Sequence, residues 1–300
     1  MRAEGVKISN LKTPEPVKQL RPSTREMELE EYRGIWYTDE RLDFHEILDE
    51  AVRRNARSVP IICTKDDLLD IGNGNFKLKV KTFGETYNLR EKERFFHQQV
   101  AACLICSGAL IKEDVVVTAA HFVDRNVKNL RFVFGYVMTS PSTAVVQLPR
   151  EQIYHGVEIL HWQYDVDKPA STGSDWTFVK LDRKVEGREI VKFSKEPPFY
   201  EQPIYVIGYP CGLPLKYTHG YVDQKIEKAY FMAPLDIFSG NSGSPVFSAE
   251  THELVGIVAK GDPEDFQWTK NGVASMIYPN DKIKSIGSRC VRVSEFNAYC

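Results

Sequence analysis

Short apolar runs alternate with polar turn residues along most of the chain after Val59. Each run is rich in β-branched and aromatic residues, and Gly, Pro, Asn and Asp separate one run from the next. This pattern predicts many short strands, and therefore an all-β sandwich or barrel. The expected strands lie within residues 76–83, 115–120, 130–137, 176–181, 204–210, 254–261 and 272–279.

Two segments have helical rather than strand signals. Residues 43–56 predict a short amphipathic helix, because apolar residues recur there at helical spacing: Phe44, Ile47, Leu48 and Val52. Asn280 is a favoured N-cap residue, so a C-terminal helix is expected over residues 280–286. Residues 1–30 are polar, mixed in charge and contain three prolines, which predicts a flexible extension.

Composition narrows the choice of partners. The 300 residues include 42% hydrophobic residues, enough for a sizeable core, and 39 basic residues balance 41 acidic ones. This balance predicts neither nucleic acid nor an acidic membrane as a partner. No apolar run approaches membrane-spanning length. The first 30 residues also lack the apolar core of a secretory signal, so we expect either a cytoplasmic protein or a secreted one whose signal has been removed.

The six cysteines leave two interpretations open. An even number permits disulfides, but a chain of this length does not need them for stability, and buried free thiols fit equally well. The spacing of Cys103 and Cys106 resembles half of a metal or redox motif, but no second pair accompanies it.

Two motifs supply a candidate base and a group to orient it, as serine-based acyl transfer requires. The sequence TAAH follows an apolar run and ends in His121, which therefore lies at a strand end as the candidate base. Asp175 opens the run DWTFVKL and is the candidate orienting group, ahead of the nearby Asp165 and Asp167. Taken singly, such residues are more often structural or capping residues.

The strongest signal is the sequence GNSGSPVF over residues 240–247. Gly240 and Gly243 flank Ser242 and permit a tight turn that exposes its hydroxyl group. The backbone amides of Gly240 and Ser242 would then point at one spot and form an oxyanion hole. An ordinary Gly/Ser turn is the alternative, which the His and Asp motifs upstream disfavour.

In this order, the three motifs resemble the chymotrypsin/trypsin superfamily of serine peptidases. The resemblance covers about residues 80–287, and GNSGSPVF, VIGYP and LVGIV are most similar to bacterial trypsin-like peptidases, the branch that includes glutamyl endopeptidases. It implies two six-stranded antiparallel β-barrels with the catalytic triad His121, Asp175 and Ser242 between them. It further implies hydrolysis of a protein or peptide substrate without a metal or cofactor, and we expect a monomer.

Some positions depart from the family pattern. Asn241 stands where vertebrate trypsins carry an Asp that pairs with a newly freed amino terminus, so that ion pair cannot form. Cys106 lies fifteen residues before His121, where trypsins have a disulfide cysteine, but Phe122 occupies the position of its usual partner.

The resemblance also suggests a specificity pocket. Its floor lies six residues before the nucleophile, at Asp236, and a carboxylate there favours Arg or Lys in the substrate. Gly261 and Gly272 would form the walls and keep the pocket open, while Lys260 lies close to it. A carboxylate at a loop entrance without this role is the alternative.

Acidic specificity is disfavoured by the same comparison. Glutamyl endopeptidases carry a Thr and a His as key pocket residues, and the matching positions here are Ile237 and Val258.

We therefore expect an N-terminal extension over residues 1–58, a peptidase domain over residues 59–287 and a tail over residues 288–300. The rival hypotheses are an inactive binding module on the same fold, an esterase with the same triad, and an intracellular regulatory protease with one protein substrate.

Overall fold

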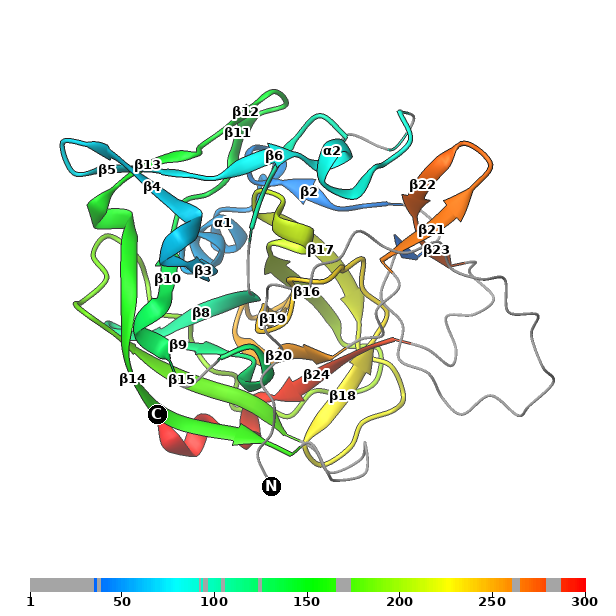
Figure 1. The fold of residues 1–300 in the computed structure, drawn as a ribbon. Coiled ribbons are helices and arrows are strands. Elements are labelled where there is room, and N and C mark those ends of the chain that lie inside the picture. The colour runs from blue at the N-terminus through cyan, green and yellow to red at the C-terminus, as the bar shows by residue number, and fades with distance from the viewer. Residues whose placement is uncertain are drawn as a thin grey trace, which may run out of the picture.

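The computed structural model describes residues 35–36, 39–91, 93, 97–103, 106–123, 126–165, 174–260, 265–278 and 287–300. The expected extension over residues 1–30 and the expected helix over residues 280–286 lie outside this part of the chain. The described chain forms two β-structures, built from its earlier and its later strands, that pack against each other (Figure 1).

Six strands close the first barrel, and every neighbouring pair is antiparallel. Apolar residues alternate along these strands, so one set of side chains, including Val116, Phe132 and Val179, fills the interior. Around the barrel the strands are β10 (Leu130–Val133), β14 (Ile153–Tyr164), β15 (Asp175–Leu181), β9 (Val115–Thr118), β8 (Cys106–Lys112) and β3 (Ile61–Thr64).

The second barrel is formed from a sheet of seven described strands. Its interior includes Val206, Phe231 and Val246, all nearly or completely buried. In order across the sheet the strands are β18 (Tyr230–Ala233), β24 (Ser288–Arg292), β20 (Leu254–Lys260), β19 (Pro245–Ser248), β16 (Pro203–Gly208), β17 (Lys216–Tyr221) and β2 (Leu42–Asp43).

The ends of the peptidase domain differ from the sequence prediction. Residues 288–300 were expected to be a tail, yet β24 lies inside the second sheet between β18 and β20. It belongs there because Cys290 and Val291 point to opposite faces and both are completely buried. At the other end, β2 comes from the expected extension and pairs with β17, which gives the sheet its seventh strand.

The upstream helix is shorter than the sequence suggested. A 3-10 helix over Phe44–Glu46 is followed by α1 (Glu50–Arg57), whose N-cap Asp49 accepts hydrogen bonds from two amides of the first turn. Leu48 lies between the two helices and is 94% exposed, so it does not contribute to an apolar helix face.

Smaller elements cover the barrels. A second short helix, α2 (Phe83–Tyr87), ends at Asn88 in a left-handed conformation. The remaining sheets are β13 (Gln147–Pro149) with β5 (Asn75–Leu78) and β4 (Leu68–Gly72), β6 (Val80–Thr82) with β7 (Val100–Ala102), β11 (Met138–Ser140) with β12 (Thr143–Ala144), β21 (Phe266–Thr269) with β22 (Gly272–Ser275), and β1 (Ile35–Trp36) parallel to β23 (Ile277–Tyr278). Further 3-10 turns span Lys65–Asp67, Ala120–Phe122, Val127–Asn129, Arg150–Gln152, Pro210–Gly212, Val293–Glu295 and Asn297–Tyr299.

One apolar cluster joins the two barrels. Val117 and Phe178 from the first barrel belong to the same buried cluster as Ile207, Phe247 and Ile257 from the second. Because this interface is packed like a protein interior, it fixes the strand ends of one barrel relative to those of the other.

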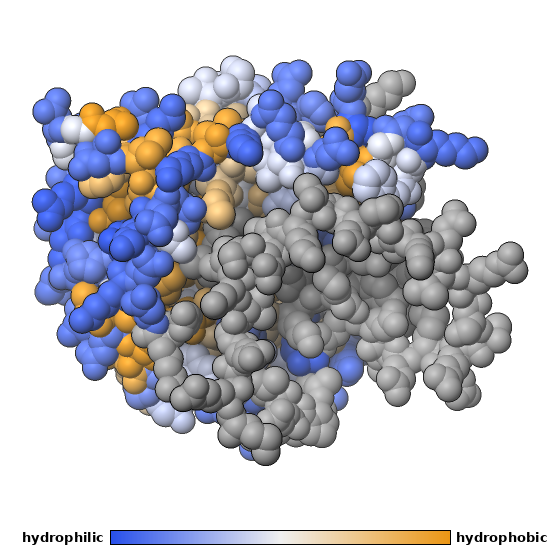
Figure 2. Space-filling model, in the orientation of Figure 1, coloured by the Kyte–Doolittle hydropathy of each residue, from blue (hydrophilic) through white to orange (hydrophobic). Residues whose placement is uncertain are grey.

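The six cysteines fall into a buried and an exposed group. All six cysteines are free: Cys63, Cys106, Cys211 and Cys290 are buried, and Cys103 and Cys300 are exposed. Figure 2 shows mainly hydrophilic side chains over the described part of one face, with hydrophobic patches among them over β4, β5 and β13. Among the helices of the described residues, none has the length and apolar character needed to span a membrane.

Candidate active site

Two neighbouring strands of the first barrel bring His121 and Asp175 together. His121 lies three residues after Thr118, the last residue of β9, and Asp175 is the first residue of β15. These strands pair with Thr177 opposite Thr118, so the antiparallel register carries Asp175 to the backbone just before His121.

Both carboxylate oxygens of Asp175 are used at this position. Oδ2 is hydrogen-bonded to Nδ1 of His121. Oδ1 accepts the backbone amides of Ala120 at 2.8 Å and His121 at 3.0 Å. The carboxylate is therefore fixed by the same turn that carries the imidazole, which sets the orientation of the ring.

Aromatic side chains flank the imidazole. The ring centroids of His121 and Phe122 are 4.1 Å apart, and Tyr164, which pairs with Asp175 across β14 and β15, lies 6.1 Å from His121. Burial, followed by the charge of Asp175, raises the pKa of the Tyr164 hydroxyl above its usual value, so the phenol stays neutral beside the pair. His121 keeps a partly exposed side chain, as a group that exchanges protons with a substrate requires.

The GNSGS sequence forms a tight turn at the place where the second barrel meets the first. Gly240 and Gly243 adopt φ angles of +92° and +79°, a region that residues with a Cβ avoid. Asn241 stabilises the turn, since its amide and its Nδ2 both donate to the carbonyl of Phe238, at 3.1 and 3.2 Å. Its Oδ1 accepts the hydroxyl of Ser244 at 3.2 Å.

This turn packs directly against the strand end that carries His121. A Cβ on Gly243 would clash with the carbonyl of Ser107 and the hydroxyl of Thr118, and would lie 2.8 Å from the amide nitrogen of Ala119. Thr118 and Ala119 precede His121 by three and two residues. The turn that carries Ser242 therefore adjoins the His121–Asp175 pair.

Hydrogen bonds from Ser107 hold the turn from the side of the first barrel. Its amide donates to the carbonyl of Ser242 at 2.9 Å, and its hydroxyl donates to the carbonyl of Gly240 at 2.8 Å. The Gly240 amide forms no hydrogen bond to another described residue. Ser242 itself has no exposed surface.

The expected specificity pocket is only partly described. Asp236 is 7% exposed, and its Oδ2 accepts the backbone amide of Glu40 at 3.2 Å. Ile237 and Val258 are completely buried in the apolar interior of the second barrel. Gly261 lies outside the described residues.

The position of Gly272 corrects the sequence prediction. Gly272 begins β22, which pairs with β21 in a separate hairpin, and a Cβ there would meet Arg90. The strand beside β20 is β24, which follows Gly287. Two strands that begin at a glycine or directly after one, β22 and β24, follow β20 in the sequence. The local pattern does not reveal which of them pairs with β20.

Two residues of the site had escaped the sequence analysis. Ser107 lies inside the apolar strand β8, and a polar residue in such a run is a signal of a buried hydrogen-bond role. Asp265 is 5% exposed, and its two carboxylate oxygens both lie 3.0 Å from the amide nitrogen of Ser239. Nothing in the local sequence distinguishes this Asp from its neighbours.

Cys106, which lies beside the strand end that leads to His121, has an unreactive thiol. Cys106 contacts the hydroxyl of Thr118 at 3.2 Å, and burial raises the pKa of its thiol to about 12, so it stays protonated. Among the described residues, no group of three or more His, Cys, Asp and Glu side chains is arranged to hold a metal ion.

Comparisons with known proteins agree with this architecture. A model of the trypsin-like peptidase domain family matches residues 106–257, which is half of the chain. A solved structure of a Glu endopeptidase in complex with MPD has a TM-score of 0.52 at 14% identity, and the match covers 88% of this chain and 98% of that one. No match was found among curated protein sequences.

Two further solved structures are similar at lower scores. An inactive form of Rv3671c from M. tuberculosis H37Rv has a TM-score of 0.47 at 13% identity, with 84% of this chain and 89% of that chain covered. A scabies mite inactivated protease paralogue has a TM-score of 0.48 at 14% identity, with 82% and 93% covered.

The family match includes the strand before His121, Asp175 and the GNSGS turn, and the two-barrel fold predicted from the sequence is confirmed by the sheets and by the similar solved structure. The chain belongs to the trypsin-like peptidase domain family of serine endopeptidases.

Proposed function

We propose that this chain cleaves peptide bonds through an acyl-enzyme, with Ser242 as nucleophile, His121 as general base and Asp175 as the group that orients the base. The observation that carries the proposal is the Asp175 carboxylate, which binds Nδ1 of His121 with one oxygen and the backbone of the same turn with the other. This arrangement leaves Nε2 of the imidazole as the nitrogen that exchanges protons.

The reaction would proceed in two stages. The Oγ of Ser242 attacks the scissile carbonyl carbon while Nε2 of His121 takes the hydroxyl proton, and the carbonyl oxygen becomes an oxyanion. The C–N bond then breaks as His121 returns that proton to the leaving amine. A water molecule repeats the sequence on the acyl-enzyme, which releases the acid and restores Ser242.

The oxyanion would be stabilised by the amides of Gly240 and Ser242. The left-handed conformation of Gly240 supports this role, and so does the carbonyl of Asn241, which accepts the amide of Ser244 at 2.8 Å and thereby fixes the peptide plane that carries the Ser242 amide. Loss of one such donor typically costs about 100- to 1000-fold in turnover.

Asp236 is the basis of a proposed preference for Arg or Lys. A buried carboxylate six residues before the nucleophile supports it, and a substrate cation would bind this carboxylate, whose Oδ2 also accepts the Glu40 amide. Gly272 lies in a separate hairpin and Gly261 lies outside the described residues, so the support for this preference comes from Asp236.

Labelling with a fluorophosphonate tests the proposed nucleophile. Because Ser242 is fully buried, this small electrophile needs less displacement of the surrounding chain than a peptide does. We expect one adduct, located on Ser242 by mass spectrometry, and none in Ser242→Ala. A folded wild-type protein without an adduct would instead favour an inactive binding module.

Fluorogenic peptides ending in Arg, Lys, Glu, Phe or Ala test the specificity. We expect cleavage after Arg and Lys, and no cleavage by Ser242→Ala. Cleavage after a different residue, lost equally in that variant, would retain the mechanism and reject Asp236 as the pocket floor.

A further inference from the structure

A short upstream segment lies against the base of the Ser242 turn. We define the strap as Asp39–Asp43; its last two residues are β2, which pairs with β17. The amide of Glu40 donates to Asp236, which lies 196 residues further along the chain. The strap therefore contacts the second barrel six residues before Ser242.

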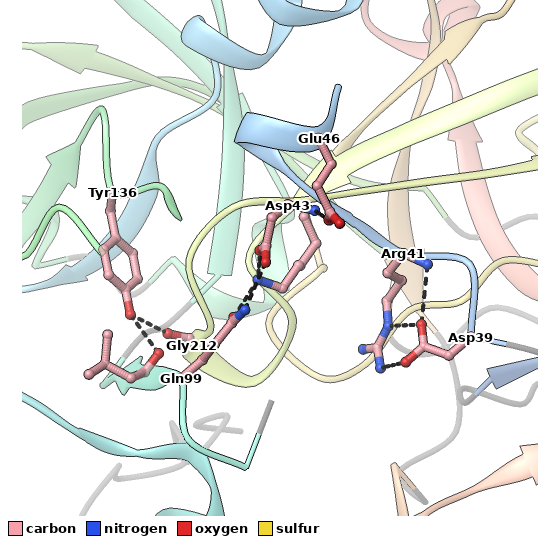
Figure 3. Close-up of polar contacts among 9 residues, drawn as sticks. Asp39, Arg41, Asp43, Glu46, Gln99, Tyr136 and Gly212 are labelled. Carbon is pink, nitrogen blue, oxygen red and sulfur yellow. Dashed lines mark hydrogen bonds and ion pairs between the residues drawn. The ribbon is translucent and has the colours of Figure 1, made fainter. Parts of the chain in front are cut away.

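Arg41 is the most deeply buried charge of the strap. Its side chain has no exposed surface, and its guanidinium forms a two-point contact with Asp39, from Nε at 2.9 Å and from Nη2 at 2.8 Å (Figure 3). This fork fixes the plane of the guanidinium, as a lysine could not.

The fixed guanidinium lies on the ring of Phe238. The distance from its central carbon to the ring centroid is 4.4 Å, which is within the range of cation–π attraction. Phe238 is completely buried, and its carbonyl accepts both hydrogen bonds from Asn241. The ring of Phe238 therefore contacts the strap, and the backbone of the same residue begins the turn that carries Ser242.

A buried polar cluster anchors the far end of the strap. The Nζ of Lys216 contacts the Oδ1 of Asp43 and lies 2.8 Å from the Oε1 of Gln99, whose Nε2 donates to Asp43 at 2.7 Å (Figure 3). The Tyr136 hydroxyl lies 3.1 Å from the carbonyl of Val100, which holds the segment that carries Gln99. Three distant segments of the chain meet at this cluster.

Buried charges are expensive to desolvate, so a buried ion pair adds little net stability, and in some proteins such pairs instead specify a defined geometry. The strap places two such pairs, Asp39–Arg41 and Asp43–Lys216, on either side of Leu42. We propose that the strap positions the Ser242 turn, and that Arg41 is a positioning residue that acts through its contact with the ring of Phe238. This inference rests on the proposed role of Ser242 as the nucleophile.

The proposal is tested by comparing Arg41→Met with Arg188→Met. Arg188 is a suitable control because it is partly buried and its guanidinium also lies against an aromatic ring, 4.8 Å from that of Phe134 in the first barrel. Both variants lose a stacked cation, but only one of these cations adjoins the base of the Ser242 turn. Each is measured at a temperature at which circular dichroism shows it fully folded.

We expect Arg41→Met to react with the fluorophosphonate on the order of 100-fold more slowly than the wild type, because a small displacement of a reacting group has effects of this size. In peptide cleavage the loss should appear in kcat with little change in KM. The labelling rate of Arg41→Lys should lie between those of the wild type and Arg41→Met, and folded Arg188→Met should react at the wild-type rate. Equal rates for Arg41→Met and Arg188→Met would overturn the proposal.

A second variant covers the case in which Arg41→Met does not fold. Phe238→Leu keeps an apolar side chain and removes the ring that receives the guanidinium, so it should also slow the labelling reaction. A folded Phe238→Leu protein with the wild-type rate would contradict the proposed route of action.

Labelling of the wild-type protein distinguishes a failure of the positioning role from a failure of the proposed function. A wild type labelled at Ser242, together with an Arg41→Met variant that matches its control, rejects the positioning role and leaves the proposed function intact. A folded wild type with no label rejects the proposed function, and the positioning role with it.

Discussion

In the first barrel, His121 and Asp175 are delivered by two strands that are hydrogen-bonded neighbours, whereas the Ser242 turn is held by residues from distant segments of the chain. The register of β9 and β15 alone brings the first two side chains together. The turn depends on Ser107 from the first barrel, Asp265 from beyond β20 and the strap.

The two regions also differ in chemistry. The first barrel is filled by aliphatic and aromatic side chains, while the second has buried charges on strands of its sheet, at Asp43 and Lys216, and next to it, at Arg41. An apolar interior tolerates changes of shape if its volume is kept, but a buried ion pair fails when either partner is lost. We therefore expect substitutions in the two regions to fail in different ways.

The largest effect should follow from Asp175→Asn. An amide at this position favours the wrong imidazole tautomer, and we expect kcat for peptide cleavage to fall by about 10⁴-fold while the fold is retained. Asp165→Asn is the matched control, since Asp165 accepts a hydrogen bond from nearby Gln163 and should leave kcat close to the wild-type value. Equal losses in the two variants would contradict the assignment of Asp175.

The next largest effect should follow from Gly243→Ala. The new Cβ meets Ser107 and Thr118 across the junction of the two regions, so we expect the free energy of unfolding to fall by more than about 4 kcal/mol. Gly187→Ala is the control, because Gly187 has a similar φ of +69° and a Cβ there would meet no heavy atom within 4 Å. It should cost only the backbone strain of about 1–2 kcal/mol.

Urea denaturation of both glycine variants measures the difference. Similar midpoints for the two proteins would show that backbone conformation, rather than the close approach of the turn to β9, accounts for the cost.

A smaller loss is expected for Lys216→Met. It leaves the Asp43 carboxylate buried without its cation, which should lower the free energy of unfolding by about 3 kcal/mol. Adding Asp43→Leu to this variant should recover part of the loss, because the second change removes the unpaired charge. A double variant less stable than Lys216→Met would show that Asp43 acts mainly through Gln99.

The same lysine has a pH signature. Burial outweighs the attraction of Asp43 and lowers the pKa of Lys216 to about 8, from 10.5 in the unfolded chain. The unfolded state therefore binds more protons between these two values, and stability due to this group rises with pH. Between pH 7 and 9 the wild type should gain about 1 kcal/mol, and Lys216→Met should not.

The site was predictable from sequence where it depends on local motifs. His121, Asp175 and Ser242 could be selected because each stands beside a strand and the three occur in a recognisable order. The structure brings His121 and Asp175 into contact and places the Ser242 turn against the same strand end.

Local pattern was insufficient where a residue depends on which strand becomes its neighbour. The family resemblance assigns Gly272 to the pocket wall, but β22 pairs with β21 and leaves the place beside β20 to β24. The alternation of apolar and polar residues identifies a strand without naming its partner.

The sequence by itself determined the β-rich fold, the order of the His, Asp and Ser motifs and the family, because strand periodicity and tight-turn glycines are local properties. Only the tertiary structure decided that β24 completes the second sheet and that Arg41 lies on Phe238. Arg41 and Phe238 are 197 positions apart (238 − 41), and the geometry of such contacts arises from the packing of the whole chain rather than from any single segment of it.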